Sequence, residues 1–241
     1  MVKSILFLVF VCFACYTGYA QGANSPDSFT TSAESNAVSY YYQFIDKQSR
    51  LYNGVDHIGY PSKIKGFAYF STDELQKGTV VYDGLLFKDV PMLYDLLKDQ
   101  LVILHFNNLM KMSLITPKVK EFSVNGHHFI RIVKDSLHNQ PLETGFYDAL
   151  YSGKSAILVK RTKFVEERVS DRLDQEFIER NTFYIQKDGA FKIVKNYKGL
   201  LHLFGDKARE VRRYLKKNKL KYRRDRETTI IKAATYYDTL N

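Results

Sequence analysis

The chain has 241 residues, of which 45% are hydrophobic and 26% charged, and its formal net charge is +10. That apolar content excludes an intrinsically disordered polymer, and the length suffices for one sizeable core or for a domain with an appendage. The aromatic residues are 18 Tyr and 17 Phe, with no Trp, and such side chains favour pleated, half-buried strands.

The N-terminus has the pattern of an export signal (residues 1–20). Lys3 precedes an apolar run over residues 5–15, and a more polar stretch follows and ends at the small residue Ala20. This arrangement is typical of a signal peptide cleaved after Ala20, with lipid attachment at Cys15 as the alternative. The apolar run is too short to cross about 30 Å of hydrocarbon, and no later run reaches transmembrane length. We therefore expect an exported protein that is periplasmic, outer-membrane-associated or secreted.

The two cysteines of the chain, Cys12 and Cys15, both lie in the predicted signal peptide. The mature protein is therefore expected to have no disulfide, no thiol nucleophile and no thiolate metal ligand. An exported protein without disulfides must be held together by its own core, which suits a bacterial envelope or secreted protein.

The next segment changes from polar to helical character. Residues 21–36 are rich in Ser, Thr, Ala and Asn and predict a flexible leader. A helix is predicted from residue 37, because large apolar residues repeat at helical spacing between residues 38 and 45. Asn53-Gly54 ends that helix, and irregular structure is expected over 55–77.

Between residues 78 and 194 the sequence has the punctuation of β-hairpins. Four two-residue turn signals separate apolar runs: Asp83-Gly84, Asn107-Asn108, Asn125-Gly126 and Asp188-Gly189. Two further runs, 146–151 and 156–169, bring the total to about ten strands. Alternating charge in the later strands leaves one face wet, as an antiparallel sheet permits. We therefore predict a mostly antiparallel, curved β-sheet, built as a hairpin meander that could curl into a half-barrel.

After residue 194 the hydrophobic period lengthens from two to about three and a half, which predicts helices. Residues 198–204 form the first, ended by Gly205, and Asp206 and Asp225 are the expected N-caps of two more. Apolar stripes that should dock on the sheet are Ala208, Val211 and Leu215, then Ile230, Ile231, Ala234 and Tyr237. The fold class is therefore α+β, with a domain of one helix and the sheet over 37–205 and basic C-terminal helices over 206–241.

The positive charge is concentrated at the C-terminal end. Residues 206–241 contain twelve Lys or Arg and five Asp or Glu, a net charge of +7. The candidate anion- or partner-binding residues are Arg212, Arg213, Lys216, Lys217, Lys219, Lys221, Arg223 and Arg224. They predict an anionic surface, a glycan or an acidic protein as partner. A solvated helix face that keeps the protein soluble is the alternative. Nucleic acid is not expected, because export removes the protein from the cytoplasm and few aromatic residues interleave the charges.

Two local motifs invite a cofactor or metal interpretation that we reject. Residues 152–155 read SGKS, like the end of a phosphate-binding P-loop, but Asp148 stands where that motif needs glycine and a strand follows. His127 and His128 are adjacent on a strand and must point to opposite faces, so they cannot share one metal ion. We therefore expect no cofactor and no metal site.

No nucleophile elbow of a serine hydrolase is present, and no catalytic residue can be named. Carboxylates such as Asp95, Asp99, Glu143 and Asp148 leave open an alternative function: an envelope-polymer hydrolase with a catalytic carboxylate pair. Three Tyr-Asp pairs recur, at 82–83, 94–95 and 147–148; on strands they should place the aromatic ring inward and the carboxylate outward.

Several stretches resemble a family of uncharacterised secreted bacterial proteins: LYNGVDHIGY from Leu51, YDGLLFKDVPMLYDLLKDQLVIL, TGFYDALYSGK and the terminal KKNKLKYRRDRETTIIKAATYYDTL. The resemblance implies an envelope location but no activity, ligand or catalytic residue. A looser analogy, at the level of the fold, is with periplasmic half-barrel lipoprotein carriers. We therefore predict an exported, non-enzymatic protein that binds a partner or an amphiphilic ligand through a curved sheet with a basic helical tail.

Overall fold

A computed structural model of the chain describes residues 36–37, 50–135, 141–169 and 173–240. The contacts divide the chain into two units, Met1–Val38 and Ser39–Asn241. In the first unit only residues 36–37 are described, and they are helical. The predicted signal peptide, nearly all of the leader and most of the helix predicted from residue 37 to Asn53-Gly54 lie outside the described residues; near its end the structure describes a 3₁₀ turn over Arg50–Tyr52. The following paragraphs concern the second unit.

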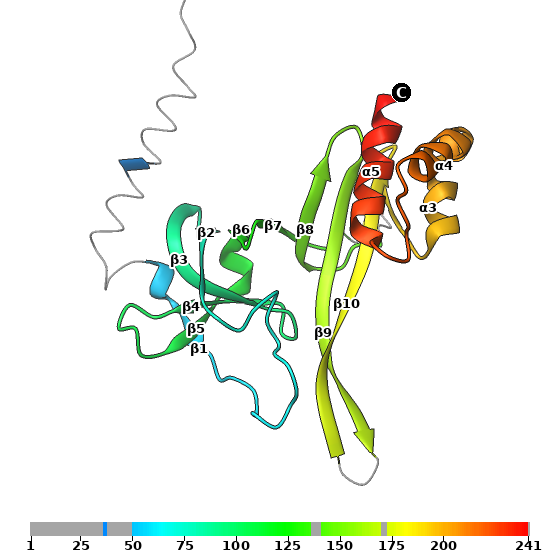
Figure 1. Ribbon diagram of the computed structural model, residues 1–241. Helices are drawn as coiled ribbons and strands as arrows, with labels where there is room; N and C mark the ends of the chain where they lie inside the picture. Colours follow the sequence, from blue (N-terminus) through cyan, green and yellow to red (C-terminus); the bar gives the residue numbers. More distant parts are fainter. Residues whose placement is uncertain (1–35, 38–49, 136–140, 170–172, 241) are drawn as a thin grey trace, which may run out of the picture. The chain divides into compact units, whose positions relative to one another are not determined.

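An antiparallel sheet of eleven described strands forms the framework of this unit (Figure 1). The strands are β1 (Gly54–Asp56), β2 (Gln76–Tyr82), β3 (Leu85–Asp95), β4 (Gln100–Leu104), β5 (Lys111–Leu114), β6 (Val119–Val124), β7 (His127–Ile132), β8 (Gly145–Ser152), β9 (Ala156–Val169), β10 (Leu173–Lys187) and β11 (Ala190–Ile193). Their order across the sheet is β1-β5-β4-β3-β2-β6-β7-β8-β9-β10-β11, so the sheet is open, with β1 and β11 at its edges. The predicted antiparallel architecture is confirmed. The count exceeds ten because β1 pairs with β5 inside the segment that was expected to be irregular.

Three of the four predicted turns are tight hairpins with both central residues at positive φ. The φ angles are 51° and 81° at Asp83-Gly84, 53° and 76° at Asn125-Gly126, and 52° and 78° at Asp188-Gly189. These values define type I′ turns, for which Asn-Gly and Asp-Gly are the preferred sequences. The prediction for Asn107-Asn108 is wrong, because β4 and β5 are joined by a six-residue loop in which His105 N donates to Met110 O at 2.9 Å.

Three α-helices follow the sheet: α3 (Tyr197–Leu203), α4 (Ala208–Lys217) and α5 (Arg226–Thr239). Single 3₁₀ turns lie at η3 (Arg50–Tyr52), η4 (Thr116–Lys118) and η5 (Gly205–Lys207). The predicted cap of α5 is confirmed, since the Asp225 carboxylate accepts a hydrogen bond from Thr228 N at 2.9 Å. The predicted cap of α4 is wrong: Asp206 lies inside η5, so the chain is already helical there and no side chain caps α4.

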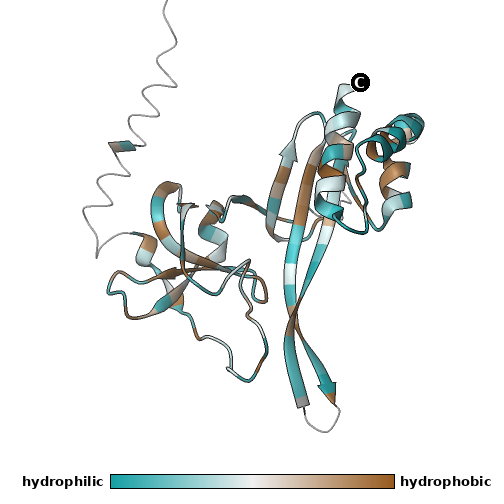
Figure 2. Ribbon diagram, in the orientation of Figure 1, coloured by the Kyte–Doolittle hydropathy of each residue, from teal (hydrophilic) through white to brown (hydrophobic). Residues whose placement is uncertain are grey.

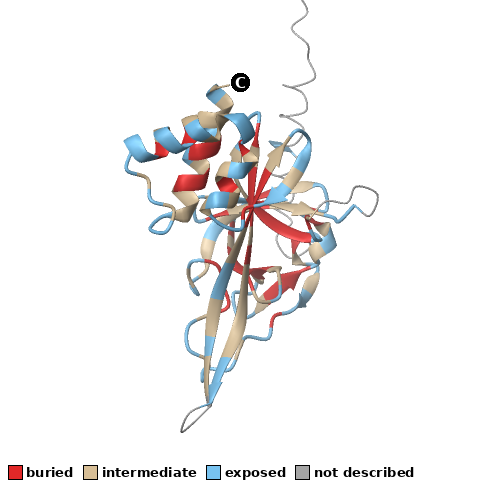
Figure 3. Cartoon of the chain, turned by 90° about the vertical axis from the view of Figure 1, so that its right-hand side faces the viewer, coloured by how far each residue is buried: buried red, intermediate tan, exposed pale blue. Residues whose placement is uncertain are grey.

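The buried residues form two main apolar clusters. The first lies on strands β2 to β8 and includes Tyr82, Met92, Phe122 and Phe146. The second lies where the helices cover the sheet, and it joins Ile157, Val159, Phe183 and Ile185 of the strands to Val211, Leu215, Ile230 and Ala234 of the helices (Figures 2 and 3). The predicted docking of the apolar stripes is confirmed except at Ala208, which is not part of this cluster. Each such aliphatic side chain contributes roughly 1.5–3 kcal/mol by leaving water.

Candidate anion-binding site on the C-terminal helices

Helix α4 carries its buried and charged residues on opposite faces. Val211 and Leu215 are 0% and 1% exposed and fix the helix to the sheet. At 3.6 residues per turn, the side chains farthest from them form one broad outer face. That face, which we call the basic ridge, consists of the exposed residues Arg209, Arg212, Arg213, Lys216 and Lys217. Hydrophobic burial of one face therefore determines which cations reach the solvent.

The turn after α4 folds the next cations back beside the ridge. Leu220 N donates to Leu215 O at 3.0 Å, and Lys219 N donates to Lys216 O at 3.1 Å. This is a Schellman ending, and its left-handed position is Lys219 at φ +55°, where glycine is the usual residue. The ending lets the chain run back past α4, so that Lys221 and Arg223 line the same hollow as Lys216.

An open pocket of about 900 Å³, which we call the basic pocket, lies between the start of α3 and the segment after α4. It is lined by Asn196, Tyr197, Lys198, Arg212, Lys216, Lys219, Leu220, Lys221, Tyr222 and Arg223. These ten residues include six cations and no carboxylate. The rings of Tyr197 and Tyr222 lie 5.7 Å apart at 51° and, with Leu220, form the apolar part of its wall.

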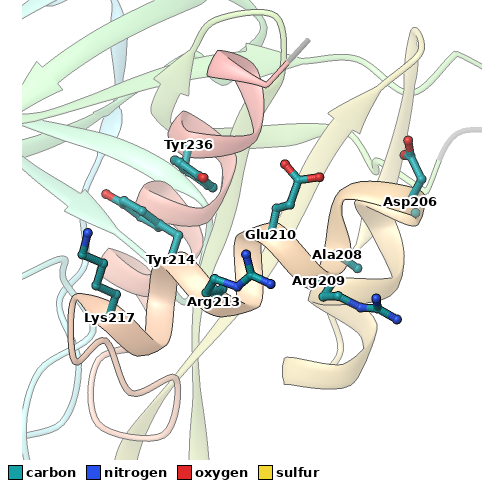
Figure 4. A pocket seen from close by; sticks show the side chains of 9 residues that line it. Asp206, Ala208, Arg209, Glu210, Arg213, Tyr214, Lys217 and Tyr236 are labelled. Atoms are coloured by element: carbon teal, nitrogen blue, oxygen red, sulfur yellow. The ribbon is translucent and has the colours of Figure 1, made fainter.

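A second open pocket, of about 910 Å³, lies on the other flank of α4 (Figure 4). We call it the tyrosine pocket because the Tyr214 and Tyr236 rings stack in it, with centroids 4.1 Å apart and planes at 5°. Its charged residues are Asp206, Arg209, Glu210, Arg213 and Lys217. Lys207 Nζ lies 3.8 Å from the Glu210 carboxylate. This pocket therefore offers both cations and hydrogen-bond acceptors to a ligand.

The structure brings together most of the eight sequence-predicted cations. Arg212, Lys216, Lys219, Lys221 and Arg223 line the basic pocket, and Arg213 and Lys217 line the tyrosine pocket. Arg224 is exposed and lies outside both linings. Within the part of the chain that the structure describes, none of the eight pairs with a carboxylate, so their charge remains available to a ligand. Three lining residues, Tyr197, Lys198 and Arg209, were not predicted from the sequence. Only Arg209 had a signal there, because it lies close to the dense run of basic residues.

The Tyr-Asp pairs depart from expectation, because two of their carboxylates are buried. Asp95 is 0% exposed and ends β3, where it accepts hydrogen bonds from Leu97 N at 2.9 Å and Lys98 N at 3.0 Å. Tyr60 Oη also donates to it at 2.6 Å. Burial is the larger cause, and this carboxylate the smaller cause, of a raised pKa at Tyr60. The predicted outward orientation of Asp95 is therefore wrong, because its carboxylate closes the β3–β4 turn.

Asp148 is the second buried carboxylate, at 1% exposure, and it too contradicts the predicted outward orientation. Its Oδ2 accepts from Arg161 Nε at 2.7 Å and lies 2.7 Å from His127 Nδ1. Arg161 Nη2 also donates to Glu227 Oε2 at 2.8 Å, so the network joins β7, β8 and β9 to the first turn of α5. Burial alone would lower the pKa of Arg161, but Asp148 and Glu227 outweigh it and raise that pKa. The guanidinium therefore compensates the buried charge.

The other two carboxylates singled out in the sequence are also paired. Asp99 Oδ1 accepts from Tyr94 Oη at 2.5 Å, and its Oδ2 accepts from Lys160 Nζ at 2.6 Å. Glu143 accepts from Lys134 Nζ at 2.8 Å. All four carboxylates thus accept hydrogen bonds from donors of the protein itself, although the Glu143 side chain is 68% exposed.

The histidine pair and the SGKS segment lie as predicted. His128 is opposite Ser123, and its Nδ1 is hydrogen-bonded to Ser123 Oγ at 3.0 Å. His127 points to the other face of the sheet, toward Asp148. Within the described ranges, no three or more His, Cys, Asp or Glu residues gather as metal ligands. The SGKS segment joins β8 to β9, and the Asp238 carboxylate of α5 accepts from Ser155 N at 2.9 Å. The segment therefore joins two strands and contacts α5 through Asp238.

Searches with family models, against curated proteins and against solved structures find no match to this chain. Among the described residues, no helix combines the length and the apolar character that a bilayer span requires. The geometry of the helices and their two pockets is therefore the basis for a functional proposal.

Proposed function

We propose that this protein is an exported, non-enzymatic binding protein whose C-terminal helices hold an anionic partner or amphiphilic ligand in the basic pocket. The single observation that carries the proposal is the lining of that pocket: six cations and no carboxylate, grouped around Tyr197, Leu220 and Tyr222. Unpaired cations placed this close repel one another, and a bound anion relieves that repulsion. The apolar wall can receive the apolar part of the same ligand.

The chemistry of the lining favours oxyanions. Arg212 and Arg223 each offer a planar fork of donors that matches a carboxylate, sulfate or phosphate group in two parallel hydrogen bonds. Lys198, Lys216, Lys219 and Lys221 add point charges around them. Such charge-assisted hydrogen bonds contribute about 1.5–3 kcal/mol each.

The sheet has a supporting role in this proposal. It holds α3, α4 and α5 through the second apolar cluster, and we infer that it curves in the manner of a half-barrel. Register shifts at Gly78/Val80, Val81/Tyr82 and Ala149/Tyr151 support that curvature, because bulges bend and twist the strands that contain them. Export is supported by the apolar run after Lys3, and protein recovered from the cytosol with an intact Met1 would contradict it.

The proposal is tested by titrating the full chain with dodecyl phosphate below its micelle concentration. We expect Arg212→Gln/Lys216→Gln to weaken binding roughly tenfold or more, because two charge-assisted contacts are lost. The matched control is Lys88→Gln/Lys120→Gln, which removes two exposed cations from the sheet. Equal affinity of the two double variants would sink the proposal, since binding would then follow net charge alone.

A further inference from the structure

The two pockets share one wall, and together they exceed what a small anion can fill. Arg212 and Lys216 face the basic pocket, whereas Arg213 and Lys217 face the tyrosine pocket, and all four belong to α4. The ridge between the pockets runs along α4, a helix of ten residues, or about 15 Å. Each pocket alone has the volume of a complete small-ligand site. A ligand that uses the whole basic surface must therefore be a chain that crosses α4.

The tyrosine pocket indicates the chemistry of such a chain. Figure 4 shows Arg209, Glu210, Arg213 and Lys217 following one another along α4, with Asp206 just before that helix. Tyr214 lies near Lys217, and Tyr236 faces Tyr214 from α5. The cations suit carboxylate or sulfate groups, while Asp206 and Glu210 can accept hydrogen bonds from hydroxyl groups. The stacked Tyr214 and Tyr236 add an aromatic surface against which the apolar face of a sugar ring can pack. A chain of acidic sugars carries all three kinds of group.

Two other polyanionic partners fit less well. A bilayer surface would be held by apolar side chains as well as by charge, yet none of the described residues 194–240 is an exposed large apolar residue. A nucleic acid has fewer hydroxyl groups than a polysaccharide to donate to Asp206 and Glu210, so less hydrogen bonding offsets the repulsion between these carboxylates and its phosphates. Its bases cannot insert between Tyr214 and Tyr236, because those rings already stack on each other at 4.1 Å, so the pair offers only an outer surface for stacking.

We propose that the ligand is a linear acidic polysaccharide that lies across the basic ridge and occupies the basic pocket and the tyrosine pocket together. This inference rests on the proposed function, since the basic pocket supplies one of its two sites. In it the sugar carboxylates or sulfates bind the arginines and lysines, and sugar hydroxyls donate to Asp206 and Glu210.

The test measures affinity for size-defined oligogalacturonates by calorimetry at constant ionic strength. We expect the affinity per chain to rise steeply with length until one chain crosses α4, because the second pocket is then filled intramolecularly. Arg213→Gln/Lys217→Gln, which replaces two exposed residues, should weaken the long oligomer about tenfold and leave dodecyl phosphate binding unchanged. Tyr236→Leu should weaken the long oligomer as well, without affecting a single-stranded oligonucleotide of equal charge.

The outcomes separate the two proposals. If Arg212→Gln/Lys216→Gln weakens dodecyl phosphate binding but oligogalacturonates show no dependence on length, the basic pocket stands and the polysaccharide inference is overturned. A tighter complex with the oligonucleotide or with phosphatidylglycerol vesicles than with the long oligomer would overturn it too. If no anion responds to Arg212→Gln/Lys216→Gln, the proposed function itself fails.

Discussion

Several buried polar side chains in this protein have specific hydrogen-bond partners. His57 is an example on the sheet edge, at 8% exposure: its Nδ1 lies 3.1 Å from Ser113 Oγ, and its Nε2 lies 2.9 Å from Tyr69 Oη. Burial lowers the pKa of His57 from its usual 6.5, and Asp95 opposes that shift in part. Lys98 and Lys111 lower the pKa further, so the fold holds this imidazole in the neutral form.

This arrangement predicts a loss of stability on mild acidification. The unfolded chain protonates His57 near pH 6.5, whereas the folded chain does so only at lower pH, so the unfolded state binds more protons between the two pKa values. The contribution of neutral His57 is therefore complete above about pH 6.5 and is lost as the pH falls below it, at up to ~1.4 kcal/mol per pH unit. Urea unfolding should show that the difference in free energy of unfolding between the unsubstituted chain and His57→Gln decreases from pH 7 to pH 5. A difference that stays constant over this range would contradict the prediction.

At the scale of single elements, the C-terminal end of α4 combines strain with charge. Lys219 lies in the left-handed region at φ +55°, a conformation that glycine adopts without a Cβ clash. The residue nevertheless lines the basic pocket. A lysine at this position therefore gives up some helix stability and supplies a cation to the site.

Lys219→Gly should separate these two effects. We expect the free energy of unfolding to rise by about 0.5–1 kcal/mol, because the strain at the Schellman position is relieved, while the affinity for dodecyl phosphate falls severalfold. The matched control is Lys221→Gly, which removes a cation from the same pocket at a residue that is not at positive φ. It should weaken binding without any gain in stability. A loss of stability in Lys219→Gly would show that the left-handed conformation carries no strain.

The elements that could be predicted from sequence are those encoded in a few neighbouring residues. Asp83-Gly84 and Asn125-Gly126 specify their turns by themselves, because both residues of each pair tolerate positive φ. Asp225 and Asp206 look alike as caps, but only Asp225 has a non-helical backbone, with φ −144° and ψ 88°, whereas Asp206 already belongs to η5. Strand β10 (Leu173–Lys187) pairs with β9 along nearly its whole length, from Leu173↔Val169 to Gln186↔Ala156. Pairing between distant segments leaves little local signal.

The candidate site shows the same division between local and distant information. The run of lysines and arginines from Arg212 to Arg224 is visible in the sequence, and its residues are exposed in the structure. The pocket is not visible, since Tyr197 and Lys198 come from α3 and meet Lys216 only after the three helices have docked on the sheet. The density of basic residues in the sequence predicts a charged face, but it does not predict the basic pocket and the tyrosine pocket beside that face.

Across the whole of the second unit, the two apolar clusters share strands. Strand β8 supplies Phe146 to the first cluster and packs Leu150 and Tyr151 against the second. The polar network of Asp148 and Arg161 crosses the same strand and reaches Glu227 on α5. Because both cores and the network depend on β8, we infer that sheet and helices unfold as one cooperative unit.

Arg161→Met tests that inference. The substitution leaves Asp148 buried without its guanidinium, which should cost about 3–5 kcal/mol of unfolding free energy. Native-state hydrogen exchange should then accelerate in both β3 and α4, although neither element contributes a residue to the network of Arg161. The control is Arg168→Met on the same strand, an exposed residue paired with Glu166 at 2.5 Å, whose loss should change stability by no more than ~0.5 kcal/mol. Replacing the buried pair in Arg161→Met/Asp148→Leu should restore part of the lost stability. Faster exchange in α4 with unchanged exchange in β3 would instead mean that the helices unfold independently of the sheet. The basic pocket would then belong to a separately unfolding helical subdomain.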